Sequence, residues 1–413
     1  MGPERPAREA RGLPVSQMLS DVQALAGQIG PRGTGTSGER AAADYVAGLL
    51  ALRGVEVERQ TFRAVGSQNA FPLAIDLMVL LAVALYWAGR APGRWVATAL
   101  ALSAAPMLWQ TIRTSDCPLR PLLPKVASRS VLARIEPRGE TRQRVVLLAH
   151  LDTNRCRIAW QSSAVRSLEP LTYLTLVMLA SLGLLYLVGA LLGRPQWVAW
   201  ASLLPTAYTF ATVITLWKDE LTPYTPGAHD NAASVAVALE VSRRLAAQRL
   251  DGTQVWLAFT GAEETDHAGL YALLGRHGAA LRDAAFIGLE GLGSGELVYL
   301  TRQGLCSHYS PDPGLQALLA RIATQRADLD VRAAQMTQED EVGTLRRFGY
   351  RALCLAGRDP VSGTLPHWHR PDDTVETISS EFMQRAADLV MAVLAALDDR
   401  ASSSQKEKLC AHS

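Results

Sequence analysis

The sequence is short of charge, because aspartate, glutamate, lysine and arginine make up only 19% of its 413 residues, against about a quarter in a typical soluble protein. Basic and acidic residues nearly balance, 41 against 39, so the chain lacks the positive excess that nucleic-acid-binding proteins carry. Hydrophobic residues make up 48% of the chain, which excludes intrinsic disorder because this much apolar side chain can be buried. We therefore expect a folded protein with no nucleic-acid partner.

Cysteine is also scarce. The five cysteines are widely spaced and form no CxxC pair, which argues against a disulfide scaffold and against a zinc site made of thiolates. Residues 1–18 contain no apolar run, so we expect no secretory signal peptide there. Both absences agree with reduced thiols in a cytosolic setting.

The missing charge is confined to two blocks, residues 71–112 and 169–217, which together contain only five charged side chains. The other 322 residues carry 75 of the 80 charges, a normal proportion for a soluble protein. Each block divides at a short polar turn into two apolar segments, and a helix of about 20 residues crosses the core of a bilayer. The four segments are 71–89, 95–112, 171–192 and 196–217. We predict two transmembrane hairpins, because such long helices without a polar face are unusual in a soluble core.

The remaining sequence would form one domain interrupted by the two hairpins. It comprises residues 15–70, 113–168 and 218–400, with polar tails at 1–14 and 401–413. About 70 residues precede the first span without a signal peptide, so we expect this domain to face the cytoplasm. Asp76 is the ionisable residue well inside a span, and it lies near the start of that span, where its side chain can reach the interface.

Outside the hairpins, β-branched stretches such as RVVLLAHLD and VWLAFTG alternate with helical patterns, among them 234–245, 270–281 and 381–398. This alternation predicts an α/β fold in which helices sandwich a mostly parallel, mixed sheet. Ligands in such folds bind at the carboxyl ends of the strands.

Acidic and imidazole side chains occur at these places. They are His150 and Asp152, Glu263 and Glu264, and Glu290 after strands, with Asp230 and His369 in loops ahead of helices. Each alone would be an ordinary surface or helix-capping residue. Together, nitrogen and oxygen donors without thiolates are what a site for two cations requires, with a shared carboxylate and a free base.

Five motifs in this order resemble those of the M28 zinc exopeptidases. They are AHLDT (149–153), PGAHDNAAS (226–234), FTGAEE (259–264), FIGLEGLGSG (286–295) and HWHRPDDT (367–374). The N-terminal segment 29–62 also resembles that family, so the resemblance covers almost all of the sequence outside the hairpins. It implies a zinc peptidase fold, phosphorylase- and hydrolase-like, with two zinc ions.

The resemblance also implies the metal ligands. His150 and Glu290 would bind one ion, Glu264 and His369 would bind the other, and Asp230 would bridge both. Glutamate stands at 290 where soluble members usually have aspartate. The roughly 80-residue gap between His150 and Asp230 is explained if the second hairpin is an insertion beside the active site.

The same resemblance implies that Glu263 is the general base, that Asp152 fixes the ring of His150 from behind, and that Asp373 supports the closing loop. His229 stands where the family often has aspartate. His367 is a rival to His369, but the spacing HxPxDT from 369 to 374 favours His369 as the ligand.

We therefore expect a membrane-anchored di-zinc aminopeptidase that cleaves the N-terminal bond of short peptides. An N-acyl-amino-acid or carboxypeptidase-type amide hydrolase stays open, as does a catalytically silent receptor or scaffold on the same fold. Single-metal glutaminyl cyclases resemble this fold but lack the first histidine ligand, so His150 favours hydrolysis. The hairpins would hold the site against the bilayer, where the substrate is a peptide released near the membrane or linked to lipid. The sequence indicates no oligomeric state.

Overall fold

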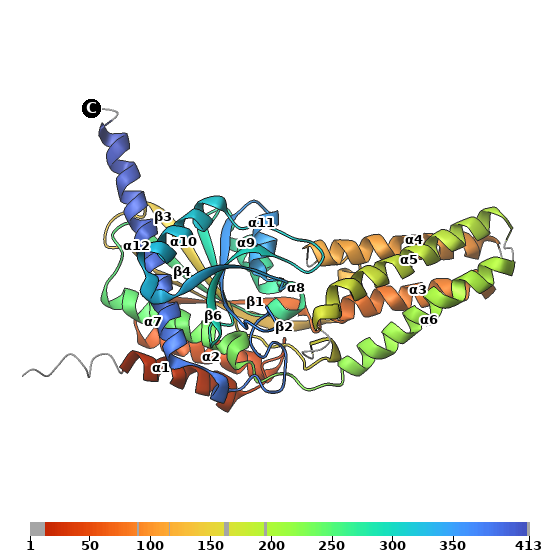
Figure 1. Cartoon of the computed structure of the whole chain (residues 1–413), viewed down its shortest axis with the longest axis horizontal. Helices are drawn as coiled ribbons and strands as arrows, with labels where there is room; N and C mark the ends of the chain where they lie inside the picture. Colours follow the sequence, from red (N-terminus) through yellow and green to blue (C-terminus); the bar gives the residue numbers. More distant parts are fainter. Residues whose placement is uncertain (1–12, 89–90, 115, 161–164, 194–195, 411–413) are drawn as a thin grey trace, which may run out of the picture.

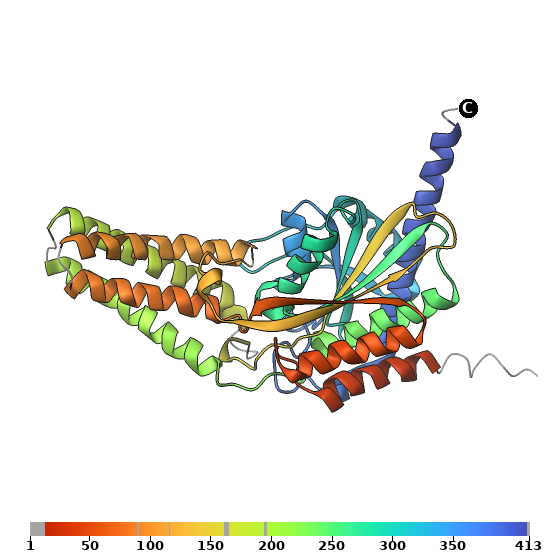
Figure 2. The ribbon, with the colours of Figure 1, turned by 180° about the vertical axis from the view of Figure 1, so that it is seen from behind.

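The computed structural model describes residues 13–88, 91–114, 116–160, 165–193 and 196–410. A twisted sheet lies at its centre, and a group of long helices projects from one side (Figures 1 and 2). The strands are β1 (Glu56–Val65), β2 (Lys125–Ile135), β3 (Gln143–His150), β4 (Thr253–Thr260), β5 (Ala285–Glu290), β6 (Glu296–Gln303), β7 (Val331–Met336) and β8 (Arg351–Arg358). They lie in the order β1-β2-β4-β3-β5-β8-β6-β7.

The centre of the sheet is parallel and both edges contain antiparallel pairs. β4, β3, β5 and β8 run in the same direction, whereas β1 and β2 pair antiparallel on one side and β6 pairs antiparallel with β8 on the other. Val145–Ala149 of β3 are all buried, as expected for a central strand covered on both faces. The predicted mixed α/β sheet is therefore confirmed.

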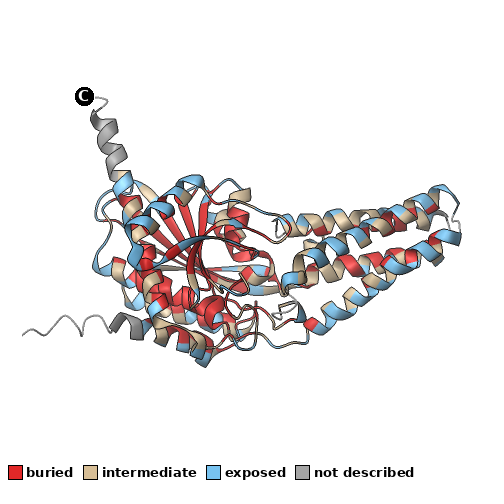
Figure 3. Ribbon diagram, viewed as in Figure 1, coloured by how far each residue is buried: buried red, intermediate tan, exposed pale blue. Residues whose placement is uncertain are grey.

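Helices cover both faces of the sheet. One face packs against α1 (Leu13–Val22), α2 (Ser37–Leu52), α7 (Ser234–Ala247), α10 (Pro313–Gln325) and α12 (Ser380–Cys410). The other face packs against α9 (Ala268–His277) and α11 (Glu341–Arg347). The apolar faces of these helices supply the two hydrophobic cores, and the burial pattern in Figure 3 follows these layers.

Four long helices form a bundle beside the sheet: α3 (Ala70–Ala88), α4 (Ala91–Thr114), α5 (Leu168–Leu191) and α6 (Gln196–Asp219). Each is long and apolar enough to cross a membrane, by length and composition. α4 begins at Ala91 rather than at the expected residue 95, because Pro92 fits the first turn of a helix. The two helix pairs also pack against each other through α4 with α5 and α3 with α6, so they form one bundle.

The bundle has its own apolar core and an apolar outer surface. Inside it, Ile75, Leu182 and Tyr186 are completely buried. On its outer surface, Leu184 and Trp200 are 57% and 68% exposed. Contiguous exposed apolar surface of this kind marks a site of contact with a membrane or another protein.

The strand connections place this bundle and the carboxyl ends of β3 and β4 at one edge of the sheet. α3 follows the end of β1 at Val65, which is paired with the start of β2 at Lys125. Because β2 runs antiparallel to β4, the start of β2 lies toward the end of β4 at Thr260. α5 is reached from the end of β3 at His150, which is paired with Thr260. All four helices therefore begin or end beside the strand ends where a ligand site is expected.

Candidate metal centre

Two clusters of metal-binding side chains share one carboxylate at this edge of the sheet. In the first, Nε2 of His150 lies 3.1 Å from Oδ1 of Asp230 and 3.4 Å from Oε2 of Glu290. In the second, Nε2 of His369 lies 3.1 Å from Oδ2 of Asp230 and 3.1 Å from Oε2 of Glu264. The donor atoms of each cluster lie within 4.8 Å of one another, close enough to hold a metal ion. Asp230 presents one oxygen to each cluster.

The fold brings these five side chains together from distant parts of the chain. His150 is the last residue of β3, and Glu290 is the last residue of β5, its neighbour in the sheet. Glu264 lies in α8 (Glu263–Asp266), which begins just after β4. Asp230 lies in η5 (Ala228–Ala233), an irregular turn directly before α7, and His369 lies in the loop that precedes α12. The structure therefore gathers all five residues that the sequence singled out as candidate ligands.

Hydrogen bonds aim the ligands at the two clusters. Nδ1 of His150 donates to the main-chain carbonyl of Asp152 at 2.9 Å, which leaves Nε2 free to face Asp230. Donation from one ring nitrogen fixes the tautomer and orientation of a metal-binding histidine. Asn231 Nδ2 donates to the Leu289 carbonyl at 2.9 Å and to Oε2 of Glu290 at 3.3 Å, and so fixes that carboxylate.

The atom of Asp152 that orients His150 differs from the expectation. The sequence suggested the carboxylate, but its nearest oxygen is 3.9 Å from Nδ1, and the main-chain carbonyl takes its place. The carboxylate instead accepts the amide hydrogens of Glu263 at 3.0 Å and Glu264 at 3.2 Å, and the Thr34 hydroxyl at 2.8 Å. Asp152 therefore holds the turn that carries both glutamates, since a buried carboxylate must be satisfied by donors.

The two histidines that departed from the pattern lie outside both clusters. His229 is completely buried, and its ring bonds Asp373 at 3.0 Å and the Ser294 hydroxyl at 2.7 Å. His367 pairs with Asp372 at 2.9 Å near the surface. Asp373 also accepts the amide hydrogens of His229 and Asp230 at 2.7 and 3.2 Å. It thus ties the loop after His369 to the loop of the shared carboxylate.

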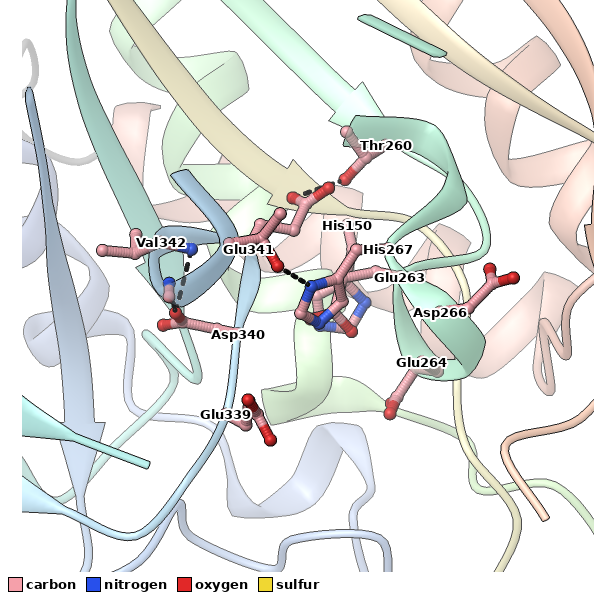
Figure 4. A network of polar contacts seen from close by, with 12 residues as sticks. His150, Thr260, Glu263, Glu264, Asp266, His267, Glu339, Asp340, Glu341 and Val342 are labelled. Atoms are coloured by element: carbon pink, nitrogen blue, oxygen red, sulfur yellow. Dashed lines mark hydrogen bonds and ion pairs between the residues drawn. The ribbon is translucent and has the colours of Figure 1, made fainter. Parts of the chain in front are cut away.

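Glu263 is buried beside the first cluster and belongs to neither. Its Oε1 lies 3.5 Å from Nε2 of His267, and the two residues lie close together in Figure 4. The other ring nitrogen of His267 bonds the Thr344 hydroxyl at 2.9 Å. Burial raises the pKa of Glu263 well above its ordinary value, and the neighbouring His150 lowers it only in part. A buried carboxyl with a raised pKa is suited to accept and return a proton.

Electrostatics of the two clusters favours bound cations. Five carboxylates (Asp152, Asp230, Glu263, Glu264 and Glu290) outnumber the three nearby imidazoles of His150, His267 and His369. Burial by itself would lower the pKa of His369, but Glu264 and Asp230 raise it to about 9. Among the described residues, neither Oε1 of Glu264 nor either ring nitrogen of His369 has a partner in hydrogen-bonding geometry. These buried oxygen and nitrogen atoms lack hydrogen-bond partners and lie in a site with excess negative charge. Divalent metal ions would satisfy both.

Strained backbone accompanies these side chains. Ala262, His267 and His369 all have a φ of 52°, a left-handed conformation that side chains with a Cβ rarely adopt. All three flank or belong to the candidate centre, where such strain commonly collects because the surrounding structure enforces it.

Two polar residues near the centre were missed by the sequence reasoning. Arg32 is 1% exposed, and its guanidinium donates to the carbonyls of Leu25, Gly30, Leu151, Pro226 and Gly227. Asn154 is also buried and donates to Glu264 at 2.9 Å. An arginine inside the turn-forming run GPRGTG was the one available signal for Arg32, and nothing in the sequence marked Asn154.

Comparison with known proteins agrees with this geometry. Residues 213–394 match Peptidase family M28. The matched range contains Asp230, Glu263, Glu264, Glu290 and His369, whereas His150 lies before it. The M28 match supports a metal-dependent, peptidase-like enzyme, and zinc is the metal that the family suggests. No protein of curated function matches the sequence.

Solved structures share the fold at low sequence identity. Glutaminyl cyclase of Porphyromonas gingivalis is 16% identical, with a TM-score of 0.56 over 93% of this chain and 98% of that one. A Zn-dependent exopeptidase from Parabacteroides distasonis is 14% identical, with a TM-score of 0.54 over 92% and 97%. BSAP, a zinc aminopeptidase from Bacillus subtilis, is 15% identical, with a TM-score of 0.55 over 93% and 95%. These similarities establish the fold, which this chain has in common with a glutaminyl cyclase, an exopeptidase and an aminopeptidase.

Proposed function

We propose that this chain is a membrane-anchored di-zinc exopeptidase that hydrolyses the N-terminal peptide bond of short peptides. One observation carries the proposal: two complete ligand clusters share the Asp230 carboxylate, with one oxygen facing each. Two metal positions joined by a carboxylate are typical of hydrolytic sites. The buried Glu263 beside them belongs to neither cluster and supplies the base.

The residues divide the chemistry between them. His150, Asp230 and Glu290 would hold one zinc ion, and Asp230, Glu264 and His369 would hold the other. The bound ions would polarise the scissile carbonyl and make water more acidic. Glu263 accepts the proton of the attacking water on its carboxylate and returns it to the leaving amine. Asp152 keeps Glu263 in place by accepting its amide hydrogen at 3.0 Å.

Aromatic side chains cover the second cluster from one side. The rings of Trp160 and His369 are 4.6 Å apart, and the rings of Trp160 and Trp368 are 4.5 Å apart. The two tryptophans line, with Leu365 and Val361, a cavity of about 170 Å³. Arg166, Asp359 and Arg370 also line this cavity, so its aromatic part would accept an apolar side chain of a substrate while its charged part would contact polar groups. We expect peptides with a hydrophobic N-terminal residue to be preferred.

The membrane anchor is proposed from the bundle. Its outer surface exposes large apolar side chains, including Leu184, Trp200, Leu204 and Phe210. Covering the exposed part of each such side chain with lipid would contribute roughly 1–2 kcal/mol, since full burial of a large apolar side chain contributes about 1.5–3 kcal/mol. We propose that α3–α6 span the bilayer and that the sheet domain lies on the cytoplasmic side. Single cysteines at the helix turns, tested with a membrane-impermeant thiol reagent in intact and opened vesicles, check both statements.

The activity test uses dipeptides that are unblocked, N-blocked or C-blocked, together with zinc analysis of the purified protein. Release of free amino acid from unblocked and C-blocked peptides only, with two zinc ions per chain, is the expected result. Release from N-blocked peptides identifies an N-acyl-amino-acid or carboxypeptidase-type hydrolase instead. Absence of both zinc and hydrolysis identifies a silent scaffold and refutes the proposal.

Cyclisation of N-terminal glutamine is the second candidate, because the cluster of Asp230, Glu264 and His369 is complete by itself and lies beside two tryptophans. A peptide that begins with glutamine separates the two reactions. Cyclisation releases ammonia and leaves the peptide chain intact, whereas the peptidase releases glutamine. The first cluster of His150, Asp230 and Glu290 favours the peptidase.

A further inference from the structure

A chain of buried hydrogen bonds runs from the base of the helix bundle to one of the candidate metal ligands. It begins at Ser67, just before α3, and at Glu220, just after α6, and it ends at Glu264. Two side chains, Arg157 and Asn154, lie between these ends, and they are only 4% and 3% exposed. Neither belongs to the chemistry proposed above.

Arg157 joins the segment before α3 to the segment after α6, which lie together at the base of the bundle. Its Nη2 donates to the Ser67 hydroxyl at 3.1 Å and to Oε1 of Glu220 at 3.3 Å. The Ser67 hydroxyl donates to the same Glu220 oxygen at 2.6 Å, which closes the contact. Nη1 of Arg157 donates to Oε1 of Gln68 at 3.4 Å and to Oδ1 of Asn154. A guanidinium can serve several acceptors at once because its donors form a rigid planar fork.

Asn154 transmits this arrangement to the ligand. Its Nδ2 donates to Oε2 of Glu264 at 2.9 Å and to Oε1 of Gln68 at 3.3 Å. Its Oδ1 accepts from Arg157 and from the amide of Arg155 at 2.9 Å. Every donor and acceptor direction of the amide is therefore used.

The chemistry of Arg157 fixes which way this amide faces. A guanidinium has donors only, so the oxygen of Asn154 must point toward Arg157 and the nitrogen must point toward Glu264. If the amide rotated by half a turn, its oxygen would face the carboxylate oxygen of Glu264, and a favourable contact would become repulsive. Arg157, together with the Arg155 main-chain amide that donates to the same oxygen, thereby keeps the Asn154 nitrogen facing Glu264.

The main chain strengthens the same connection. The Thr225 amide donates to the Asn154 carbonyl at 2.9 Å, and the Cys156 amide donates to the Pro223 carbonyl at 2.8 Å. The segment that leaves α6 toward Asp230 is thus paired with the segment that carries Asn154 and Arg157. A displacement of the α6 end would move both segments.

We propose that Arg157 is a positioning residue which, through Asn154, holds Glu264 in place for the second metal position and makes that position depend on the bases of α3 and α6. This inference rests on the proposed function, because it requires that Glu264 binds a metal ion. Removal of a partner that orients a metal ligand typically weakens metal affinity by about 10- to 100-fold. The first metal position, which does not include Glu264, would keep its affinity.

Arg155 provides a matched control. It also reaches Glu220, at 3.7 Å, and it stacks on Tyr224, but within the described part of the chain its guanidinium does not bond the Asn154 side chain. Replacing Arg155 by alanine removes an arginine from the base of the bundle, but it leaves the hydrogen bonds of the Asn154 side chain intact. Glu220→Gln is a second control, because glutamine keeps an oxygen acceptor for Arg157.

The experiment measures zinc affinity of the full-length protein in detergent by competition with a chromophoric chelator, with the melting temperature of each variant. Wild type should bind two ions. Arg157→Ala and Asn154→Ala should weaken one ion by about 10- to 100-fold and leave the other unchanged. Arg155→Ala and Glu220→Gln should bind both ions as wild type does.

The outcomes separate this inference from the proposed function. Two ions bound by Arg157→Ala with unchanged affinity would refute the positioning role alone. Equal weakening of both ions, or the same loss in Arg155→Ala, would also refute it, because general destabilisation would then explain the effect. A wild-type chain that binds no zinc would refute the proposed function and the inference together.

Discussion

Replacing Glu263 by glutamine removes the proposed base while changing almost nothing else in the centre. Glutamine has nearly the same volume, and the main-chain amide of residue 263 still donates to Asp152 at 3.0 Å. The carboxylate contacts His267 at 3.5 Å, and it belongs to neither metal cluster. The amide side chain cannot take up the proton of the attacking water, so the change isolates that single step.

The expected loss can be stated from this geometry. Proton transfer by a positioned side chain contributes about 10²- to 10⁴-fold, so kcat should fall by that factor, which equals about 3–5 kcal/mol of barrier. KM should change little, because the proposed role of Glu263 is proton transfer rather than substrate binding. Stability should change by less than about 1 kcal/mol, since a neutral amide replaces a buried acid of similar shape.

The assay measures dipeptide hydrolysis and zinc content on the same preparation, with Glu264→Gln as the matched control. Both substitutions lie in the same short helix, α8. Glu263→Gln should keep two ions and lose turnover, whereas Glu264→Gln should lose affinity for one ion, because Glu264 faces His369 at 3.1 Å. A Glu263→Gln variant that keeps more than about a tenth of wild-type kcat would contradict the base assignment.

Three further changes test the fold and the anchor. Arg32→Ala should lower stability by about 3–5 kcal/mol in thermal unfolding, because five carbonyls lose a buried donor, while the exposed Arg282→Ala should have little effect. Burial raises the pKa of Glu39 from 4.5 to about 8. Because the folded state holds this proton more tightly than the unfolded state, stability should fall as pH rises between these values. The melting temperature should fall less across that pH range in Glu39→Gln than in wild type. An equal fall in both proteins would show that Glu39 does not cause it. Leu204→Arg on the outer face of α6 should reduce the fraction that resists alkaline extraction from membranes, relative to Leu204→Ala, since an arginine at mid-span costs about 2.5–3.5 kcal/mol.

Much of the centre could be predicted because its ligands follow strands in the sequence. Parallel strands place their carboxyl ends at one edge of the sheet, so the strand pattern predicts that His150 and Glu290 lie at that edge. The pairing of β3 with β5, which makes them neighbours, comes from the structure. The choice between His367 and His369 depended on motif spacing. The structure supplies a physical reason, since Asp372 pairs with His367 and leaves His369 facing Asp230.

Features that depend on exact contact geometry could not be predicted. The carbonyl and the carboxylate of Asp152 lie in one residue, and only the backbone path decides which of them reaches His150. Arg32 donates to the Leu151 carbonyl and Asn154 donates to Glu264, each more than 100 residues away in the chain, and sequence patterns carry no such information. The charge deficit predicted four apolar helices, but their assembly into one bundle depends on side-chain packing between α4 and α5.

The positions of the hairpins within the sheet have a consequence for biogenesis. The first hairpin separates β1 from β2, which are adjacent partners, and the second separates β3 from the loop of Asp230. If the bundle spans a bilayer as proposed, each insertion must cross it an even number of times, because otherwise the flanking strands would end on opposite sides. The sheet can form only when each hairpin crosses the membrane an even number of times. Catalytic-domain folding would therefore report on membrane topology, and a chain with one misinserted helix would be left with an incomplete sheet and no assembled centre.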